Sequence, residues 1–522
     1  MKRQSLFRFD EPYRAFELLE SERGTPEDGP ATVSRPAPPP DNIPSGLDAV
    51  QTALRKQFRA ETNPDLILRP FRVGGRTDAL AAFLNGMADG KLIDDFLLSP
   101  GMAATLPKVL PHPERYLQKN VFTVCEASES RDFAEAIRAI TEGRTALFLE
   151  GRAVCLLFDT RGYASRSVGT PENEPVVLGP HEAFNENLRT NITLLRRILK
   201  TPSFVASFRP ARDGTGRQLA LCYADGVIHQ RLLTEIQRRL AAVRADRPLS
   251  VGMIEQAIED YPWLPLPQTL KTERPDRVAA AIADGKAAIL IEGSPIACVL
   301  PVTIGLLFAS AEDAAVRRPV GTLLRVVRAI GCVLSVWMPA YFLALAEHHA
   351  GQLSGEVLSV VLSSHVMVFL PMPVEMIFLL LVFQLVREAG VRVPGVVGHA
   401  IGIIGGLLLG QAAVAAHLVS TIALIIVALS GLGNFTIPDY STQICIAYYR
   451  IALCVAAALG GFVGLGTVTL LTIAGLCSVK SFGVPMLAPF APKTRRVRPF
   501  LRRGKAPQNV GPQDMLNAEG RL

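Results

Sequence analysis

The 522-residue sequence predicts an α/β cytoplasmic region of two related subdomains, followed by an all-α polytopic membrane domain. The first observation behind this division is the distribution of charge. Charged residues occur at ordinary density through the first 328 positions, whereas residues 329–386 contain no lysine or arginine and residues 451–479 carry no formal charge. Long uncharged apolar runs are typical of membrane spans, and a chain of this length can hold two or three domains.

The second observation is an internal repeat in the charged part, at an offset of 142 residues. The stretch "EGRTALFLEGRAVCLLF" (142–158) resembles "DGKAAILIEGSPIACVL" (284–300) as a strand, a Glu-Gly turn and a strand. Upstream, "ALAAFLNGMADGKLIDDFL" (79–97) resembles "LALCYADGVIHQRLLTEI" (219–236) as a strand, an Asx-Gly turn and a helix. Glycine between two apolar runs is a turn signal. We therefore expect two α/β subdomains, at 64–160 and 205–320.

Residues 1–63 are expected to be a disordered tail and linker. Positions 22–46, "ERGTPEDGPATVSRPAPPPDNIPSG", are rich in proline and small polar residues and poor in aliphatic ones. Such a composition cannot bury enough apolar surface to fold. No apolar core follows the basic start "MKRQSLFRFD", so we expect the first half of the chain to stay in the cytoplasm.

Residues 161–204 are expected to form a linker that contains one amphipathic helix. In "NENLRTNITLLRRIL" (185–199) the apolar residues repeat at helical spacing on one face, and three arginines lie off that face. These arginines are Arg189, Arg196 and Arg197. They predict either a solvated basic face or a contact surface for another subunit.

Residues 321–480 are expected to hold four to six helical segments of the membrane domain. Residues 329–346 form a clear first span, and residues 357–386 form a long span that is broken at two prolines. The run 397–416 follows, and its glycines at positions 402, 406 and 410 form a seam at which helices can approach closely. These helix-packing glycines are Gly402, Gly406 and Gly410.

The direction of the last spans raises a conflict. A fourth span at 417–432 returns the chain to the cytoplasm, and one further crossing would place the basic tail outside, against the positive-inside rule. Either residues 451–477 fold back at their glycines, or residues 436–449 also enter the membrane. The tail itself, 481–522, contains "KTRRVRPFLRRGK". We expect this tail to contact membrane lipids and not nucleic acid.

Glu375 is the single carboxylate of the broken span. It lies twelve residues before Arg387, so helical rise places it about 18 Å from the cytoplasmic interface, past the membrane midplane. One interpretation is a carboxylate that caps a helix N-terminus. The other is a carboxylate that faces a polar cavity, because an unpaired charge in lipid costs several kcal/mol. On the second interpretation, Glu375, Gln384 and Asp439 are candidate lining residues of an ion path.

The sequence holds no recognisable catalytic or metal-binding pattern. It has no GxSxG, no Walker loop and no cluster of histidine and cysteine, and its 8 cysteines are scattered without a CxxC. We therefore expect no enzyme activity, no cofactor, no metal and no nucleic-acid partner. The cysteines are expected to stay reduced.

Six stretches, taken in order, resemble the A-subunit (GerA) family of bacterial spore germination receptors. They are "EPVVLGPHEAFNENLRTNITLLRR" (174–197), "PLPQTLKTERPDRV" (265–278), "IEGSPIACVLPVT" (291–303), "LVREAGVRVP" (385–394), "GIIGGLLLGQAAVAAHLVS" (402–420) and "LCSVKSFGVPMLAPFAP" (476–492). The motif residues are Gly179, Pro180, Phe184, Glu186, Asn191, Arg196, Thr272, Glu273, Arg274, Pro275, Asp276, Arg387, Glu388, Ser481, Phe482, Gly483 and Pro485. A paralogous branch, the stage V sporulation protein AF type, shares these motifs.

The resemblance implies a subunit of a nutrient-sensing complex in the inner membrane of the bacterial spore. It implies as partners a permease-like B subunit, which takes the germinant, and a lipoprotein C subunit. It also implies a homo-oligomer of this chain that releases monovalent cations after the ligand binds. A non-conducting scaffold and a secondary transporter are the alternative functions.

The chain departs from the family pattern at several motif positions. Leu178 and Ala183 stand where the family usually has arginine and glycine. Leu380 and Gln384 stand where family members commonly carry further glutamates. If those glutamates line a cation path, the departures place more weight on Glu375.

Overall fold

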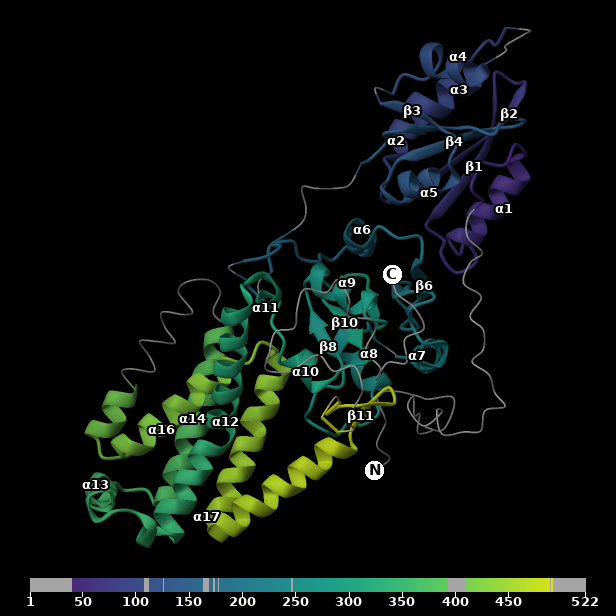
Figure 1. Ribbon diagram of the computed structural model, residues 1–522. Helices are drawn as coiled ribbons and strands as arrows, with labels where there is room; N and C mark the ends of the chain where they lie inside the picture. The colour runs from purple at the N-terminus through teal and green to yellow at the C-terminus, as the bar shows by residue number, and fades with distance from the viewer. Residues whose placement is uncertain are drawn as a thin grey trace, which may run out of the picture.

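The computed structural model describes residues 40–107, 112–124, 126–162, 169–171, 174–176, 178–245, 247–392, 409–488 and 490–491. Two α/β subdomains and a bundle of long helices follow one another along the chain, and Figure 1 shows the second subdomain between the first and the helices. The predicted fold class is confirmed.

The first subdomain is an antiparallel five-stranded sheet in the order β1-β2-β4-β5-β3 with helices on both faces. Neighbouring residues of β2 alternate between the two faces: Leu80 packs with α1 and α5, and Ala81 packs on the other side. The elements are α1 (Leu47–Gln57), β1 (Leu66–Val73), β2 (Thr77–Leu84), α2 (Gly90–Ile93), η2 (Asp94–Leu98), α3 (Ser99–Ala103), α4 (Pro113–Asn120), β3 (Ala127–Ser130), α5 (Phe133–Thr141), β4 (Thr145–Leu149) and β5 (Cys155–Phe158).

The second subdomain has the same strand order, β6-β7-β9-β10-β8. One face packs against α6 and α9, and the other packs against α7 and α8. The equivalent orders agree with the repeat read from the sequence. The elements are α6 (Leu188–Leu199), β6 (Phe204–Pro210), β7 (Gln218–Ala224), α7 (Gln230–Ala242), α8 (Val251–Ile258), β8 (Leu270–Thr272), α9 (Pro275–Ala283), β9 (Ala287–Ile291) and β10 (Ala297–Leu300).

The repeat begins earlier than the sequence suggested. Helix α1 precedes β1 as α6 precedes β6, so residues 47–57 belong to the first subdomain and not to a disordered linker. The prediction for this part of 1–63 was wrong because the proline-rich composition of 22–46 was extended over a helical pattern. Val50, Leu54 and Phe58 lie four residues apart and are fully buried.

The basic residues of α6 connect the two subdomains. The Arg196 side chain is 3% exposed, and its Nη2 donates to Asp65 Oδ2 at 2.9 Å and to Asn63 Oδ1 at 2.9 Å. Arg189 reaches the same aspartate at 3.4 Å. The solvated-face prediction is therefore wrong for Arg196, because its charge is neutralised inside the chain by a residue that precedes β1.

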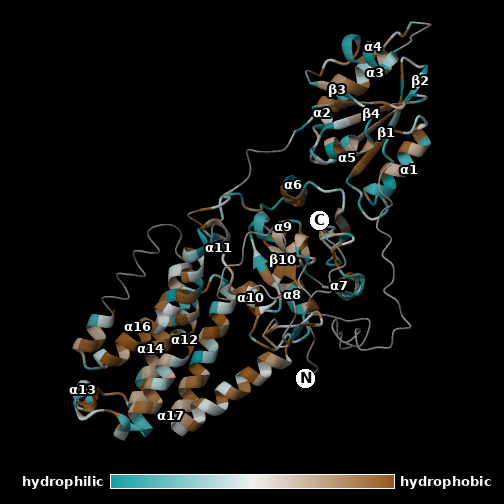
Figure 2. Ribbon diagram, viewed as in Figure 1, coloured by the Kyte–Doolittle hydropathy of each residue, from teal (hydrophilic) through white to brown (hydrophobic). Residues whose placement is uncertain are grey.

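The helical region follows β10 and exposes much apolar surface. Figure 2 shows hydrophobic residues along α12, α14, α16 and α17, and outward side chains such as Leu323, Leu429 and Leu470 are exposed. By length and composition, α12 and α17 can each cross a membrane. The elements are α10 (Ile304–Leu307), α11 (Glu312–Ala315), α12 (Arg318–His348), η3 (Ala350–Gln352), α13 (Gly355–His365), α14 (Met372–Arg392), α16 (Thr421–Phe435) and α17 (Tyr440–Ser478).

Helix α17 folds back on itself at two glycines. Gly460 and Gly461 are not helical, and the φ of +54° at Gly461 is a conformation that glycine adopts most readily. Along the first arm, His348 Nε2 lies 2.9 Å from Ala458 O. Along the second arm, Trp337 Nε1 donates to Thr469 Oγ1 at 3.1 Å, so the chain returns along α12. The structure has the fold-back at the glycines, and the first arm of the folded helix begins at Tyr440, so this arm also includes residues 440–449 of the second alternative.

The second arm of α17 ends beside the second subdomain (Figure 1), where β11 (Lys480–Ser481) and β12 (Val484–Pro485) form a small hairpin. Leu307 of α10, which precedes α12, is buried in the core of the same subdomain, so the segments before α12 and after α17 both pack on the second subdomain.

We expect Leu54→Ala to destabilise the first subdomain by about 2–5 kcal/mol, because the substitution leaves a cavity between α1 and the sheet. Pulse proteolysis of the full chain in urea measures the change. Arg55→Ala, at an exposed position one residue later, is the control and should leave the urea midpoint unchanged. If residues 47–57 were disordered, Leu54→Ala and Arg55→Ala would have the same urea midpoint.

Candidate functional site

Three motif stretches that are far apart in the sequence meet on the second subdomain, next to the helices. The backbone N–H of Glu174 donates to Glu273 Oε1 at 3.0 Å. The backbone N–H of Phe184 donates to the carbonyl oxygen of Glu273 at 2.8 Å. The linker motif and the "TERPD" motif therefore form one unit, which we call the junction cluster: Glu174, Thr272, Glu273, Arg274, Asp276 and Arg277.

Arg274 lies at the centre of the junction cluster and is 1% exposed. Its Nε and Nη2 donate to the two carboxylate oxygens of Asp276 at 3.1 and 2.8 Å. Nη2 also donates to the carbonyl oxygen of Pro180 at 3.1 Å, and Nη1 donates to that of Glu174 at 3.4 Å. One planar guanidinium thus holds the linker against the first turn of α9.

Glu174 connects the junction cluster to the helices through Arg277. Its Oε2 accepts from Thr272 Oγ1 at 2.7 Å, and its Oε1 accepts from Arg277 Nη1 at 2.6 Å. Arg277 Nη2 donates to the carbonyl oxygen of Ala309, three residues before α11. Burial raises the pKa of Glu174, although Arg277 and Thr272 oppose the shift.

A cavity of about 260 Å³ lies where the junction cluster meets the loop between α16 and α17. Glu174, Arg274 and Arg277 line it from the α/β side. Phe435 and Gln443 line it from the helical side. A displacement of the second subdomain relative to α16 and α17 would therefore change the shape of this cavity.

The "SFGVP" motif docks on the second subdomain. Ser481 Oγ donates to the carbonyl oxygen of Gln268 at 2.7 Å, and Phe482 N donates to Asp260 Oδ2 at 2.8 Å. The Phe482 ring is fully buried, with the Arg239 guanidinium 4.6 Å from its centroid. We call residues 481–486 the C-terminal clasp.

The clasp corrects the prediction that 481–522 is a basic tail. Phe482, Val484 and Met486 are buried in the cores of the second subdomain, so the fold includes residues 481–486. Phe482 and Gly483 have φ values of +48° and +75°, and Pro485 pairs with Lys480 in the small hairpin. The basic stretch that begins at 493 lies outside the described residues.

The other motif residues have local structural contacts. Gly179 has a φ of +140°, and a Cβ there would lie 3.8 Å from Arg274 Nη2. Asn191 exchanges two hydrogen bonds with the backbone of Asn185, at 2.6 and 2.8 Å. The carbonyl oxygen of Glu186 accepts from Gly293 N at 2.9 Å, and Pro275 is the first residue of α9.

The Glu375 carboxylate lies inside the helical bundle and has no exposed surface. It is in the first turn of α14, as predicted, and it accepts a hydrogen bond from the backbone N–H of Ser420, the N-cap of α16. His365 Nδ1 lies 3.1 Å from its other oxygen. The carboxylate thus lies at the N-terminal ends of two helices, where their dipoles favour negative charge. Within one chain it faces protein groups and not solvent.

Gln384 and Asp439 lie at other levels of the bundle. Gln384 follows Glu375 by nine residues on α14, about 14 Å along the helix, and its Oε1 has no partner among the described residues. Asp439 Oδ2 accepts from the N–H and the hydroxyl of Thr442, at 2.7 and 2.6 Å, and caps α17. The structure therefore does not bring the three candidate lining residues together.

The predicted glycine seam is described only in part. A Cβ on Gly410 would lie 3.6 Å from the Leu424 side chain of α16, which fits a close helix contact. Gly402 and Gly406 lie outside the described residues.

Two buried arginines complete the polar interior of the bundle. Arg387 Nη2 donates to Gln443 Oε1 at 2.9 Å, and Glu388 beside it is exposed. Arg450 is 1% exposed and donates to Ser430 Oγ at 2.9 Å. Sequence reasoning did not select Arg450, although it is the single charged residue between 440 and 479, and that isolation was an available signal.

A pair of carboxyl groups lies beneath the clasp. Glu259 Oε1 accepts from Gln268 N at 3.2 Å, and the carbonyl oxygen of Gln268 binds Ser481. Burial, and second the neighbouring Glu255 carboxylate, raise the pKa of Glu259 to about 8. Glu255 is bound by Lys271 Nζ at 2.6 Å. Glu259 therefore holds its proton near neutral pH at the base of the clasp.

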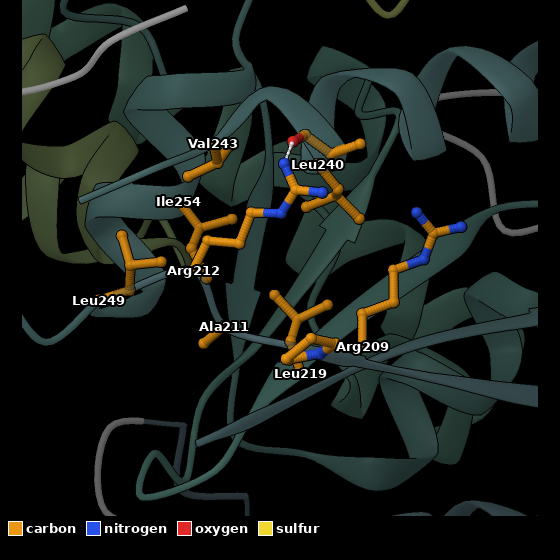
Figure 3. Close-up of a pocket in the computed structure, with 10 residues that line it drawn as sticks. Arg209, Ala211, Arg212, Leu219, Leu240, Val243, Leu249 and Ile254 are labelled. Atoms are coloured by element: carbon orange, nitrogen blue, oxygen red, sulfur yellow. Dashed lines mark hydrogen bonds between the residues drawn. The ribbon is translucent and has the colours of Figure 1, made fainter. Parts of the chain in front are cut away.

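Two other hollows lie in the α/β region. Figure 3 shows the smaller, of about 250 Å³, whose walls are mainly apolar and in which Arg212 Nη1 donates to the carbonyl oxygen of Ala241 at 2.7 Å. None of its described lining residues is an acid, a histidine or a cysteine. The larger is a groove of about 1130 Å³ between the subdomains, beside the Arg59–Asp225 ion pair. Neither contains the sequence-predicted site residues.

The fold defines a class of protein in which two α/β subdomains precede a bundle of apolar helices. The second subdomain contacts the chain at both ends of this bundle, at Ala309 and at the clasp. The family described as Bacillus/Clostridium GerA spore germination protein matches residues 52–509, and the chain belongs to this family. The chain therefore has a role in spore germination, in a family of germinant receptor subunits that is not known for enzyme activity.

Individual relatives have comparable length. Spore germination protein KA of Bacillus subtilis (strain 168) is 31% identical over 467 residues, which cover 87% of this chain and 85% of the relative. Spore germination protein GerLA of Bacillus cereus is 30% identical, over 84% of this chain and 89% of the relative. The solved N-terminal domain of the A subunit of the Bacillus megaterium spore germinant receptor GerK3 aligns with a TM-score of 0.38 and 23% identity, over 50% of this chain and 96% of that domain.

We expect Arg274→Lys to destabilise the second subdomain by about 2 kcal/mol, because an ammonium group cannot reproduce the paired bonds to Asp276 and also reach the linker carbonyls. The thermal midpoint of the full chain in detergent measures the effect. Arg231→Lys, at an exposed position on α7, is the control. An equal midpoint for both variants would contradict a central role for Arg274.

The stability of the second subdomain should fall as the pH rises from about 4.5 to about 8, because folded Glu259 binds its proton more tightly than the unfolded chain does. This group contributes a slope of at most about 1.4 kcal/mol per pH unit. Glu259→Gln removes the titration, so its urea midpoint should change less over this range. Parallel pH profiles for wild type and variant would show that Glu259 titrates normally.

Proposed function

We propose that the chain is the membrane-embedded A subunit of a spore germinant receptor, located in the inner membrane of the spore with its α/β region in the cytoplasm. Family membership and the two long apolar helices support this location. The fold-back of α17 brings the end of this helix to the second α/β subdomain, and the positive-inside rule favours the same side for the basic stretch that follows in the sequence. The proposed partners are a permease-like B subunit and a lipoprotein C subunit.

We further propose that copies of the chain assemble into a homo-oligomer that releases monovalent cations when the nutrient binds. The observation that carries this proposal is Glu375, a fully buried carboxylate deep among apolar helices. A charge at such a place is costly unless it has a function or a partner. Glu375, Gln384 and Asp439 are the proposed polar residues of the path, at successive levels.

The described arrangement corresponds, in this proposal, to the closed state. The Glu375 carboxylate is engaged by the Ser420 N–H and faces His365, so a passing cation could not use it. Opening requires α13 or the start of α16 to move away from α14. Such a change would free the carboxylate without unfolding a helix.

The junction cluster and the clasp are the proposed route by which the α/β region controls the helices. Arg277 holds the segment before α11, and the clasp holds the chain directly after α17. A shift of the second subdomain would therefore displace the chain at the start of α12 and at the end of α17 together. Such a two-point connection supports coupling between a soluble sensor part and a bundle.

A non-conducting scaffold is the second candidate function. It is favoured by the structural contacts of the same acids, because Asp439 caps α17 and Glu375 is engaged at the start of α16. In a scaffold these acids would stabilise the bundle and have no role in ion movement. Cation flux through the reconstituted complex separates the two functions.

Glu375→Ala should reduce nutrient-triggered cation release from vesicles containing the full receptor complex to the level of protein-free vesicles, while insertion and assembly persist. Glu356→Ala, which removes an exposed acid at the start of α13, is the matched control and should release cations normally. Normal release by the Glu375 variant would refute its assignment to the path. Flux that is absent from the wild-type complex would favour the scaffold.

A further inference from the structure

The loop between α8 and β8 carries an unusually exposed aromatic side chain. Trp263 is 91% exposed, the highest value among the large hydrophobic residues that the structure describes, and Tyr261 beside it is 44% exposed. The loop sequence 261–267, "YPWLPLP", contains no charged residue. An exposed apolar patch of this kind marks a contact with a membrane or another molecule.

The base of this loop is rigid. Gln268 is fully buried; its Oε1 accepts from Asp260 N and Tyr261 N at 3.1 Å each, and its Nε2 donates to the carbonyl oxygen of Tyr261 at 2.8 Å. Leu266 is 6% exposed and packs in the core of the subdomain. Prolines at 262, 265 and 267 restrict the backbone further. The exposure of Trp263 therefore belongs to an ordered loop, which loses little entropy when it binds.

Both ends of the loop are bonded to the chain directly after the last long helix. Asp260 binds Phe482 N and Gln268 binds Ser481 Oγ, whereas α17 ends at Ser478. The last turns of α17 expose apolar side chains, among them Leu471 and Ile473. If α17 crosses the membrane, the loop lies at the level where this helix leaves the lipid.

We propose that Tyr261 and Trp263 insert into the headgroup region of the membrane that α17 crosses, and so anchor the second subdomain to the lipid surface. This proposal rests on the membrane location proposed above. Tryptophan and tyrosine are enriched at this depth because each has an apolar ring and a polar hydrogen-bonding group. We choose phospholipid as the binding partner because the exposed apolar side chains of α17 would lie in the same membrane. The loop carries no charge that would oppose its entry into the headgroup region.

The chain contains 2 tryptophans, at 263 and 337, so each can be observed alone. We expect Trp263, in the full-length Trp337→Phe variant, to be quenched in phosphatidylcholine–phosphatidylglycerol vesicles by lipids brominated near the headgroup. Its emission should also lie at shorter wavelength than that of a water-exposed indole, and aqueous iodide should quench it weakly. Trp337, in the Trp263→Phe variant, should be quenched by lipids brominated deep in the acyl chains.

Trp337 distinguishes failure of the anchor from failure of the membrane location. Quenching of Trp263 by iodide and not by brominated lipid, with Trp337 still quenched at depth, would overturn the anchor alone. No lipid quenching of either residue would overturn the membrane location. Protection of Trp263 that appears only when the partner subunits are added would assign the loop to a protein contact and refute the lipid anchor. If Trp337→Phe does not fold, the difference between wild type and Trp263→Phe gives the same signal.

Discussion

The burial of one guanidinium, that of Arg274, constrains the whole junction. A buried cation must be neutralised and its N–H groups must be bonded, and Arg274 meets both needs by gathering Asp276 and the carbonyl oxygens of Glu174 and Pro180 around a single plane. The linker is therefore held against α9 and not free between two subdomains. Glu174 is fixed as a result. Arg277 binds both Glu174 and the carbonyl oxygen of Ala309, so the position of the segment before α11 is fixed as well.

The two subdomains share a strand order but not a role. The first is completed by its own α1 and connects to the second through Arg196 and Asp65. The second is completed by residues from the far end of the chain, because Phe482 and Val484 pack with α7 and α8. The second subdomain thus lies between the first subdomain and the helical bundle and contacts both. The partial match in sequence between the copies is consistent with these different surroundings.

Local patterns were enough to predict the repeated α/β subdomains and the interruption between α13 and α14, because turns, prolines and hydrophobic period act over a few residues. They left the fold-back of α17 as one of two alternatives. They could not predict which distant residues would meet. Arg196 finds its aspartate 131 residues earlier, and Ser481 finds Gln268 213 residues earlier. Glu375 was recognised from its isolation, but its neighbour His365 lies across two prolines, beyond the reach of helical spacing. Helix α1 is short and directly follows the proline-rich segment, so its buried apolar residues are a weak signal beside that composition.

The position of the clasp has a consequence for biosynthesis. The core cluster into which Phe482 and Val484 pack consists otherwise of residues that precede Val302 and of Ala488, so it is completed only after the entire bundle has been translated. During that interval the apolar residues of this cluster are open to water, and the nascent chain carries an α/β subdomain with an incomplete core. The core cluster is thus completed by Phe482 and Val484 directly after the final helix has been made, so a chain truncated within the bundle would keep an apolar surface that chaperones and proteases can recognise.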